Sequence, residues 1–264
     1  MGIFSGLGKE KWTGSLSIGI TTFERRFADY FIPLVKQLRA IDPETEIVVA
    51  VNGEHQQLFS ESYRSDLLEF LAGQSHVYPI LFPQFRGLTK LWNSIVVHAT
   101  GDHILILNDD VAITKPRFLD KVRQALGRSK GASFTINRSW SHFVISREEI
   151  DQLGYFDERL IGIGEEDGDT SWRYLSQYGR PIEDYSIAGI DNYSERTMGE
   201  QPTNIACHSG GKYSRFNRDF IYRTKYRKDA GGIKGMFDSP MSLNDPAIRQ
   251  YPYEQFYRKN REKL

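Results

Sequence analysis

Four carboxylates crowd into five consecutive positions of the chain: Glu165, Glu166, Asp167 and Asp169. Like charges at this spacing repel one another, so a fold that holds them needs a cation, a helix N-terminus or a proton to offset the repulsion. A helix dipole alone accounts for Asp169, which we expect near the start of the following helix, but accounts less well for four acids. A carboxylate held in such surroundings can act as a general base.

A second acidic pair, Asp109 and Asp110, follows the aliphatic run 104–107 and Asn108. Adjacent carboxylates at the end of a buried strand suit a hard cation such as Mg2+ or Mn2+, which prefers oxygen ligands and shares them with substrate phosphates. The alternative is an Asx turn that caps the helix expected from residue 116. The sequence alone leaves both open.

His208 stands beside a glycine pair and Lys212. A histidine in this setting could ligate a metal or contact a diphosphate, although a structural histidine is the commoner case. The other five show no metal-ligand spacing and are expected to be structural: His55, His76, His98, His103 and His142.

The stretch 212–228 carries seven Lys or Arg residues against one Asp, interleaved with aromatic residues. It could neutralise phosphate or an anionic lipid headgroup. The ordinary alternatives are a solvated surface and an amphipathic element packed on the core.

The elements that must position these groups alternate along the first half of the chain. Hydrophobic patterns predict strands at 16–20, 46–51, 77–82 and 104–107, separated by helices at 27–41, 60–72 and 88–98. This order predicts an α/β domain with a mostly parallel sheet and right-handed crossovers. Ligands bind such sheets beyond the carboxyl ends of the strands. Thr22, Asn52 and the pair Asp109–Asp110 fall at such ends.

The second half predicts a more mixed region. Helices are expected at 116–126, 147–153 and 169–177, and strands at 132–136 and 140–145. Neither a phosphate-binding P-loop, a paired-cysteine zinc motif nor a Gly-x-Ser-x-Gly nucleophile motif occurs in the sequence.

Composition narrows the class of protein. The 264 residues are 39% hydrophobic and 26% charged, which is ordinary for a globular protein. Lys plus Arg and Asp plus Glu both number 34, and this balance argues against non-specific nucleic-acid binding. The single cysteine, Cys207, permits no intrachain disulfide, as in a reducing compartment. Apolar runs fall short of the ~20 residues of a membrane span, and no secretory leader is visible, so we expect a cytoplasmic protein.

The order of these parts resembles a family-2-type glycosyltransferase with the GT-A fold, over roughly residues 16–228. The most specific likeness lies in three segments. These are Arg-Glu at 147–148, Gly-Tyr-Phe-Asp-Glu at 154–158 and Gly-Glu-Glu-Asp-Gly-Asp-Thr-Ser-Trp-Arg at 164–173. Residues 104–110 resemble the strand that ends in the family's metal-binding acidic motif, and residues 17–23 resemble its opening nucleotide-binding strand.

The resemblance implies a role for each candidate residue. Asp110 would ligate a divalent metal, Mn2+ or Mg2+, together with His208, and Asp109 would lie by the ribose or the metal. Asp167 would be the catalytic base, with Glu166 beside it. The remaining nucleotide-sugar contacts would be Thr21, Thr22, Asn52, Lys90, Asn93 and Lys212.

Two departures from the family pattern stand out. The motif reads Asn108-Asp109-Asp110, so its first ligand is an amide, and the second strand ends at Val51-Asn52 where an acid is common. Val51 cannot hydrogen-bond a uracil edge, so a UDP-sugar donor is expected from the resemblance alone.

The resemblance also implies a division of the chain. Residues 1–14 would be a tail, 15–113 the nucleotide-sugar-binding half, 114–228 the acceptor-binding and catalytic half, and 229–264 a C-terminal extension. The expected activity is metal-dependent, inverting transfer of a sugar to a hydroxyl of a glycan or lipid-linked acceptor, without nucleic acid. The basic stretch 212–228 could then contact the inner face of a membrane.

Two other classes of function remain open at this stage. A sugar-nucleotide nucleotidyltransferase would share the α/β domain and the paired acids, but needs a glycine-rich loop after the first strand, and residues 21–26 contain no glycine. A non-catalytic glycan-binding protein would bind sugar without consuming a nucleotide sugar.

Overall fold

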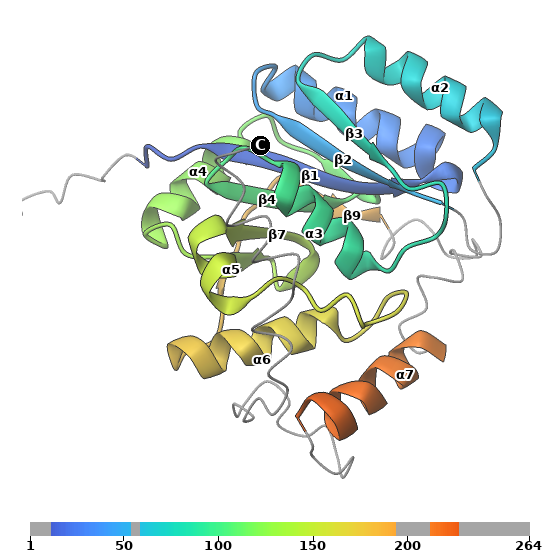
Figure 1. Ribbon diagram of the computed structural model, residues 1–264. Coiled ribbons are helices and arrows are strands. Elements are labelled where there is room, and N and C mark those ends of the chain that lie inside the picture. The colour runs from blue at the N-terminus through green and yellow to red at the C-terminus, as the bar shows by residue number, and fades with distance from the viewer. Residues whose placement is uncertain (1–11, 54–58, 194–211, 227–264) are drawn as a thin grey trace, which may run out of the picture.

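The computed structural model describes residues 12–53, 59–193 and 212–226, and its centre is a seven-stranded sheet in the order β3-β2-β1-β4-β7-β6-β8 (Figure 1). The first four strands in the chain run parallel: β1 (Leu16–Phe23), β2 (Ile47–Asn52), β3 (Val77–Leu81) and β4 (His103–Asn108). The other three make the mixed part of the sheet: β6 (Phe134–Ile136), β7 (Ser139–Ser146) and β8 (Glu183–Tyr185). β7 pairs antiparallel with both β4 and β6, and β8 runs parallel to β6.

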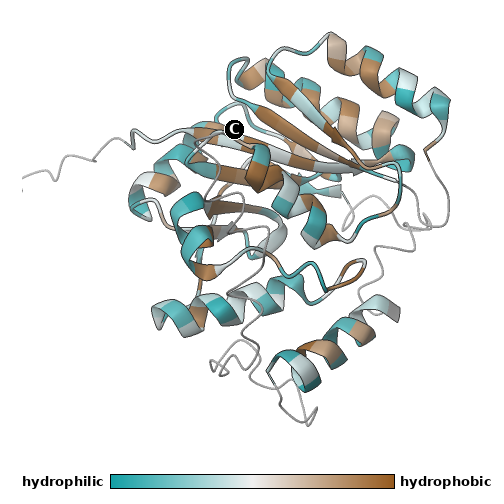
Figure 2. Ribbon diagram, in the orientation of Figure 1, coloured by the Kyte–Doolittle hydropathy of each residue, from teal (hydrophilic) through white to brown (hydrophobic). Residues whose placement is uncertain are grey.

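Helices cover both faces of the sheet. One core cluster joins the sheet to α1 (Ile32–Ile41), α2 (Glu61–Ala72) and α4 (Phe118–Arg128), and a second joins the opposite face to α3 (Leu88–His98) and α5 (Arg147–Leu153). Hydrophobic residues concentrate on the strands between these layers (Figure 2). A separate two-stranded sheet pairs β5 (Val111–Ile113) with β9 (Ile190–Asn192).

Close packing of α3 on the sheet explains the glycine in the middle of β1. A Cβ atom on Gly19 would lie 2.3 Å from Cγ2 of Ile95 on α3. Since real side chains do not approach so closely, a larger residue here would push the helix off the sheet. This matters for the site, because α3 begins at the carboxyl edge of the parallel strands.

The structure confirms the predicted α/β architecture with a mostly parallel sheet and a smaller mixed region. The helices predicted at 88–98 and 147–153 have the observed bounds, whereas the helix predicted at 116–126 lies two residues later. The helix predicted at 27–41 begins as a π-helical turn, Phe27–Phe31, and becomes α-helical only at Ile32. Pro33 offers no N–H to the regular helical ladder, which is a physical reason for the irregular start.

The helix predicted at 169–177 is longer than expected, because α6 spans Glu166–Tyr178. The two residues before it, Gly164 and Glu165, have φ of 126° and 75°, so the helix cannot extend further back. The carbonyl of Glu165 accepts a hydrogen bond from the N–H of Asp169 at 2.9 Å. The acidic run therefore forms the first turn of α6 instead of preceding it.

The basic stretch packs on the body of the protein. It forms α7 (Lys212–Phe220) and a π-helical turn, Ile221–Lys225, followed by Tyr226. A third core cluster joins this segment to α6 and the loop before it: Leu160, Trp172, Ile221, Tyr222 and Tyr226. Of the alternatives left open by the sequence, an amphipathic element packed on the core is correct for the described residues.

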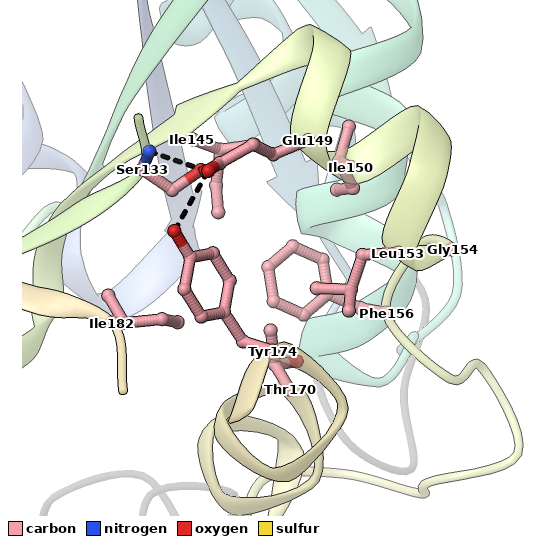
Figure 3. Close-up of a pocket in the computed structure, with 10 residues that line it drawn as sticks. All are labelled: Ser133, Ile145, Glu149, Ile150, Leu153, Gly154, Phe156, Thr170, Tyr174 and Ile182. Atoms are coloured by element: carbon pink, nitrogen blue, oxygen red, sulfur yellow. Dashed lines mark hydrogen bonds between the residues drawn. The ribbon is translucent and has the colours of Figure 1, made fainter. Parts of the chain in front are cut away.

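A small cavity between α5, α6 and β7 contains no room for a substrate (Figure 3). Its volume is about 10 Å³, which is no more than the space for one water molecule. The carboxylate of Glu149 accepts hydrogen bonds there from the N–H of Ser133 at 2.6 Å and the hydroxyl of Tyr174 at 2.8 Å. The cavity is a packing gap beside a buried polar network.

None of the described helices is long and apolar enough to cross a membrane.

Candidate functional site

The carboxyl ends of β1, β2 and β4 meet at one edge of the sheet. In the strand register, Thr21 lies opposite Asn108 and Phe23 lies opposite Asn52. The hydroxyl of Thr21 donates to the Oδ1 of Asn108 at 3.4 Å. The structure therefore gathers the predicted donor-binding residues of these strands at one place, as the topology required.

The acidic pair at the end of β4 is buried and ion-paired. Asp109 and Asp110 are 2% and 6% exposed. A single atom, Nη1 of Arg26, lies 2.9 Å from Oδ1 of Asp109 and 2.9 Å from Oδ2 of Asp110. Arg26 belongs to the 3-10 turn Glu24–Arg26 that directly follows β1. The sequence analysis did not single out Arg26. The available signal was a basic residue that closely follows β1, because β1 pairs with β4.

One member of this pair, Asp109, has a perturbed pKa. Burial raises the pKa of Asp109 to about 6, with Arg26 opposing the shift and Asp110 adding to it. The other two carboxylate oxygens, Oδ2 of Asp109 and Oδ1 of Asp110, are buried without a hydrogen-bond partner in the described structure. Oxygen atoms left in this state are suitable donors for a hard divalent cation, so the residues present fit such an ion.

The metal site predicted from the sequence is incomplete within the described residues. No group of three or more His, Cys, Asp or Glu side chains gathers in a metal-binding arrangement in residues 12–53, 59–193 and 212–226. His208, the predicted third ligand, lies outside the described residues. Lys212 is the first residue of α7, and its side chain also lies outside the described part.

His142 on β7 is a further residue near the acidic pair. It is buried, and it lies opposite Leu107 in the register of β4 and β7. Burial lowers its pKa to about 4, and the charge of Asp110 partly offsets that shift. The expectation of a purely structural histidine took no account of this neighbourhood, which antiparallel pairing creates and sequence spacing does not reveal.

Two predicted donor contacts have their side-chain amides committed to the protein. Asn52 donates to the carbonyl of Arg86 at 2.9 Å and accepts from the N–H of Arg86 at 2.8 Å. Asn93 donates to the carbonyl of Phe156 at 2.8 Å and accepts from the N–H of Phe156 at 2.9 Å. Both amides therefore anchor loops at the site, and Asn52 holds the exposed Arg86 at this edge.

Lys90 is partly exposed and forms an ion pair with an acid. Its Nζ lies 3.2 Å from Oε2 of Glu158, and the same carboxylate accepts from Asn93 at 3.1 Å. The predicted pair on α3 thus ties the first turns of that helix to the Phe-Asp-Glu segment. In the described structure Lys90 and Asn93 first serve to connect the two halves of the chain.

The acid loop, residues 161–165, leads into the first turn of α6. The carboxylates of the loop and of this turn lie in different environments. Glu166 is 6% exposed, and its Oε2 accepts from the N–H of Gly164 at 2.6 Å. Burial, together with the nearby charge of Asp167, raises the pKa of Glu166 to about 8. Asp167 is only half-buried, and burial raises its pKa as well. Asp167 is therefore the more accessible of the two predicted catalytic acids.

Glu165 is held in place by α7. Its Oε1 accepts from the hydroxyl of Ser214 at 2.8 Å and from Nη2 of Arg218 at 2.8 Å. These contacts connect Glu165, which has a left-handed backbone conformation before α6, to α7. Glu165 is thus a structural anchor of the acid loop.

Asp169 lies in the first turn of α6, near the helix start as predicted, but its side chain is buried in an ion cluster. It is 0% exposed, and its carboxylate accepts from Nε of Arg173 at 3.1 Å and from the hydroxyl of Tyr226 at 2.9 Å. Lys225 completes the cluster between Asp169 and Asp157, with its Nζ 3.1 Å from Oδ2 of Asp157. Because α6 begins earlier than predicted, Asp169 points into the interface with the segment 212–226.

Asn217 of α7 fixes the loop that carries the acids. Its amide nitrogen donates to the carbonyls of Ile161 and Gly164 at 2.9 and 2.8 Å, and its Oδ1 accepts from the N–H of Ile161 at 2.9 Å. Gly162 in the same loop has a φ of 62°, and a Cβ atom there would lie 2.7 Å from the ring of Tyr213. The loop therefore has little freedom on its α7 side.

The opposite side of this loop touches α3. The N–H of Leu88 donates to the carbonyl of Gly162 at 2.8 Å. Since α3 starts at the carboxyl edge of the parallel strands, this bond places the acid loop at the same edge as Asp109 and Asp110. The geometry thus brings both acidic motifs to one end of the sheet.

Comparisons with known proteins agree with this architecture. No protein-family model and no curated protein sequence matches the chain. The crystal structure of GalNAc-T7 with UDP, GalNAc and Mn2+ matches with a TM-score of 0.56 and 11% identity, over 81% of this chain and 49% of that one. S. aureus TarS matches with a TM-score of 0.51 and 15% identity, over 65% of this chain and 35% of that one.

A third match is the mannosyltransferase PcManGT from Pyrobaculum calidifontis in complex with GDP-Man and Mn2+, with a TM-score of 0.51 and 13% identity. It covers 67% of this chain and 55% of that one, so the chain spans between about a third and just over half of the three proteins. At such low identity the matches establish the fold. The chain has the GT-A fold of glycosyltransferases.

Proposed function

We propose that the protein is a glycosyltransferase that moves a sugar from a nucleotide-sugar donor to a hydroxyl of a glycan or lipid-linked acceptor. The observation that carries this proposal is the meeting of two acidic motifs at the ligand-binding edge of a GT-A fold. One is the buried pair Asp109–Asp110 at the end of β4, and the other is the loop that leads into Asp167. The proposed donor class is supported by two matched structures, whose complexes contain UDP or GDP-Man.

The donor would lie beyond β1, β2 and β4. Thr21 and Thr22 would line the nucleoside side, and Arg86, held by Asn52, would face it from the loop before α3. The pair Asp109–Asp110, with His208, would hold a divalent metal, Mn2+ or Mg2+. When bound, this metal would supply positive charge that offsets the charge building on the leaving diphosphate. Lys212 and Lys90 are the proposed additional cations.

Asp167 is the proposed catalytic base. It would take the proton from the acceptor hydroxyl while that oxygen bonds to the anomeric carbon and the bond to the diphosphate breaks. Attack opposite the leaving group inverts the anomeric centre, through a transition state that resembles an oxocarbenium ion. Glu166 is less suited to this role, because a carboxyl with a pKa of about 8 carries its own proton at neutral pH.

Three further features belong to the proposal. We infer a UDP-sugar donor from the family resemblance and the UDP complex among the matched structures. We place the protein in the cytoplasm because its one cysteine allows no intrachain disulfide. The exposed basic residues of α7, such as Arg215, could approach an anionic membrane from its inner face.

A donor panel tests the function. UDP-, GDP- and other nucleotide sugars are added with Mn2+, and the melting temperature is measured, because a ligand that binds the native state raises it. The best donor is then mixed with candidate acceptors, and release of free nucleoside diphosphate is followed. Binding with acceptor-dependent release supports transfer. Binding without release would indicate a glycan-binding protein, and release of pyrophosphate from a nucleoside triphosphate and sugar phosphate would indicate a nucleotidyltransferase.

A further inference from the structure

The acidic pair at the site already has a cation, and that cation belongs to the chain. Nη1 of Arg26 lies 2.9 Å from a carboxylate oxygen of Asp109 and 2.9 Å from one of Asp110. The Arg26 side chain is 10% exposed, and its guanidinium carbon lies 5.0 Å from the centre of the Phe23 ring. Arg26 is therefore a buried partner of both acids.

This guanidinium supplies the positive charge that a bound divalent cation would otherwise supply to the pair. A single nitrogen, Nη1, lies 2.9 Å from one oxygen of each carboxylate. The two remaining oxygens, on Asp109 and Asp110, are buried without a hydrogen-bond partner in the described structure. The acids are thus only half-satisfied by Arg26, and they keep donor atoms of the kind that Mn2+ and Mg2+ prefer.

Binding a divalent cation and the Arg26 guanidinium to the same two carboxylates at once is unfavourable in free energy. Both carry positive charge, the surroundings are buried, and repulsion between like charges grows as the local dielectric falls. The carboxylates therefore have two alternative partners. Which one they take depends on the ion concentration and on the affinity of each partner.

We propose that Arg26 is the resident counter-cation of the Asp109–Asp110 pair, that it competes with a divalent cation for these carboxylates, and that it thereby sets the metal affinity of the site. The inference deepens the proposed function, because it concerns the metal site assigned there. It does not depend on sugar transfer, since the competition takes place with the metal alone. Arg26 is a positioning and affinity-setting residue in this account.

Mn2+ binding measures the competition directly. Free Mn2+ is followed by electron paramagnetic resonance during titration of the full chain with MnCl2, without nucleotide. We expect Arg26→Gln to bind Mn2+ at least about tenfold more tightly than the wild type, since the neutral amide leaves both acids without a cation. Arg26→Lys keeps the charge and is expected to stay within about threefold of the wild type.

Two control variants fix the interpretation. Arg25→Gln removes the same charge from the neighbouring exposed residue and should leave Mn2+ affinity unchanged. Asp110→Ala added to Arg26→Gln should abolish the gain. The proposal is overturned if Arg26→Gln binds Mn2+ no more tightly than the wild type, or if Arg25→Gln produces the same gain.

A measurement on the wild type covers the case in which Arg26→Gln fails to fold. Nuclear magnetic resonance of the arginine guanidinium groups is recorded while Mg2+ is added. The Arg26 signal should show restricted rotation without Mg2+ and should lose that restriction as the ion binds. An unchanged Arg26 signal at saturating Mg2+ contradicts the competition. Loss of sugar transfer would leave these results untouched, so the two failures can be told apart.

Discussion

At the scale of single residues, burial decides which acid can do which task. Glu166, Asp167 and Asp169 follow one another within a single helical turn, yet the fold gives each a different environment. Glu166 turns back onto the N–H of Gly164, Asp167 stays half-exposed, and Asp169 lies in a buried ion cluster. With Glu165, which α7 holds in place, the charge run that looks uniform in the sequence is therefore one proton-holding acid, one accessible acid and two structural acids.

The pKa of Glu166 predicts a pH-dependent stability. Its folded-state pKa of about 8 exceeds the ordinary 4.5, so the native state binds this proton more tightly than the unfolded chain. Stability is therefore lost as pH rises between these two values. Glu166→Gln removes this loss, and we expect it to raise the free energy of unfolding by roughly 1–4 kcal/mol near pH 8.5 and by little near pH 4.5.

Urea unfolding at a series of pH values checks this expectation. Glu165→Gln serves as the contrast, because it weakens the acceptor of Ser214 and Arg218 and should destabilise the protein near neutral pH. If the wild type and Glu166→Gln lose stability in parallel as the pH rises, Glu166 does not hold its proton as described.

Lys225 gives a second prediction at this scale. Its side chain is 0% exposed and lies between the carboxylates of Asp157 and Asp169. Burial raises the pKa of Asp157, but the hydrogen bonds from Arg159 and the charge of Lys225 outweigh it and hold that pKa below its usual range. Lys225→Met leaves buried acids short of a cation, and we expect a loss of about 3–5 kcal/mol in the free energy of unfolding.

Arg223→Met is the matched control, since Arg223 is exposed and 4.0 Å from Asp219. We expect it to cost less than ~1 kcal/mol, as surface ion pairs do. Equal losses for the two variants in urea unfolding would mean that the buried cluster contributes no more than a surface pair.

At the scale of elements, α7 holds the acid loop in position through hydrogen bonds. Asn217 forms three hydrogen bonds to the backbone of Ile161 and Gly164, and the other side of the loop is bonded to the start of α3. The loop that leads into Asp167 is thereby fixed between two helices that are far apart in the sequence. Rigid positioning of this kind is what a base needs to meet a substrate hydroxyl.

Asn217→Ala tests whether α7 positions the acid loop for catalysis. We expect kcat for sugar transfer to fall by about tenfold or more, because small misplacements of a catalytic group are costly, while the KM for the donor changes by less than about threefold. Asp219→Ala, on the exposed side of α7, is the control and should leave both constants unchanged. A loss of activity that only follows the fraction of folded protein would reduce Asn217 to a structural residue.

At the scale of the whole molecule, the sequence predicts the architecture well and the contacts of the site less well. Hydrophobic runs such as 47–51 and 104–107 identify the parallel strands because burial on both faces leaves a continuous apolar signature. The edge where ligands bind follows from topology alone. These are properties that local sequence carries.

The partners of the site residues could not be predicted in the same way. Arg26 reaches Asp109 across 83 positions, and Asn217 reaches Ile161 across 56. Such contacts depend on side-chain directions and on loop conformations, for example the left-handed Glu165, that leave no periodic signal. For the same reason the sequence could not show that the amides of Asn52 and Asn93, which stay predicted ligand contacts, also hold the backbone of the site.

The role of Asp167 as the base is measured on Asp167→Asn with the best nucleotide-sugar donor, an acceptor and Mn2+. Release of nucleoside diphosphate gives the turnover, and calorimetry gives the donor affinity. We expect transfer to fall by at least about a hundredfold while donor affinity stays within about threefold of the wild type, because the variant loses only its general base. Unchanged turnover in Asp167→Asn would mean that Asp167 is not the catalytic base.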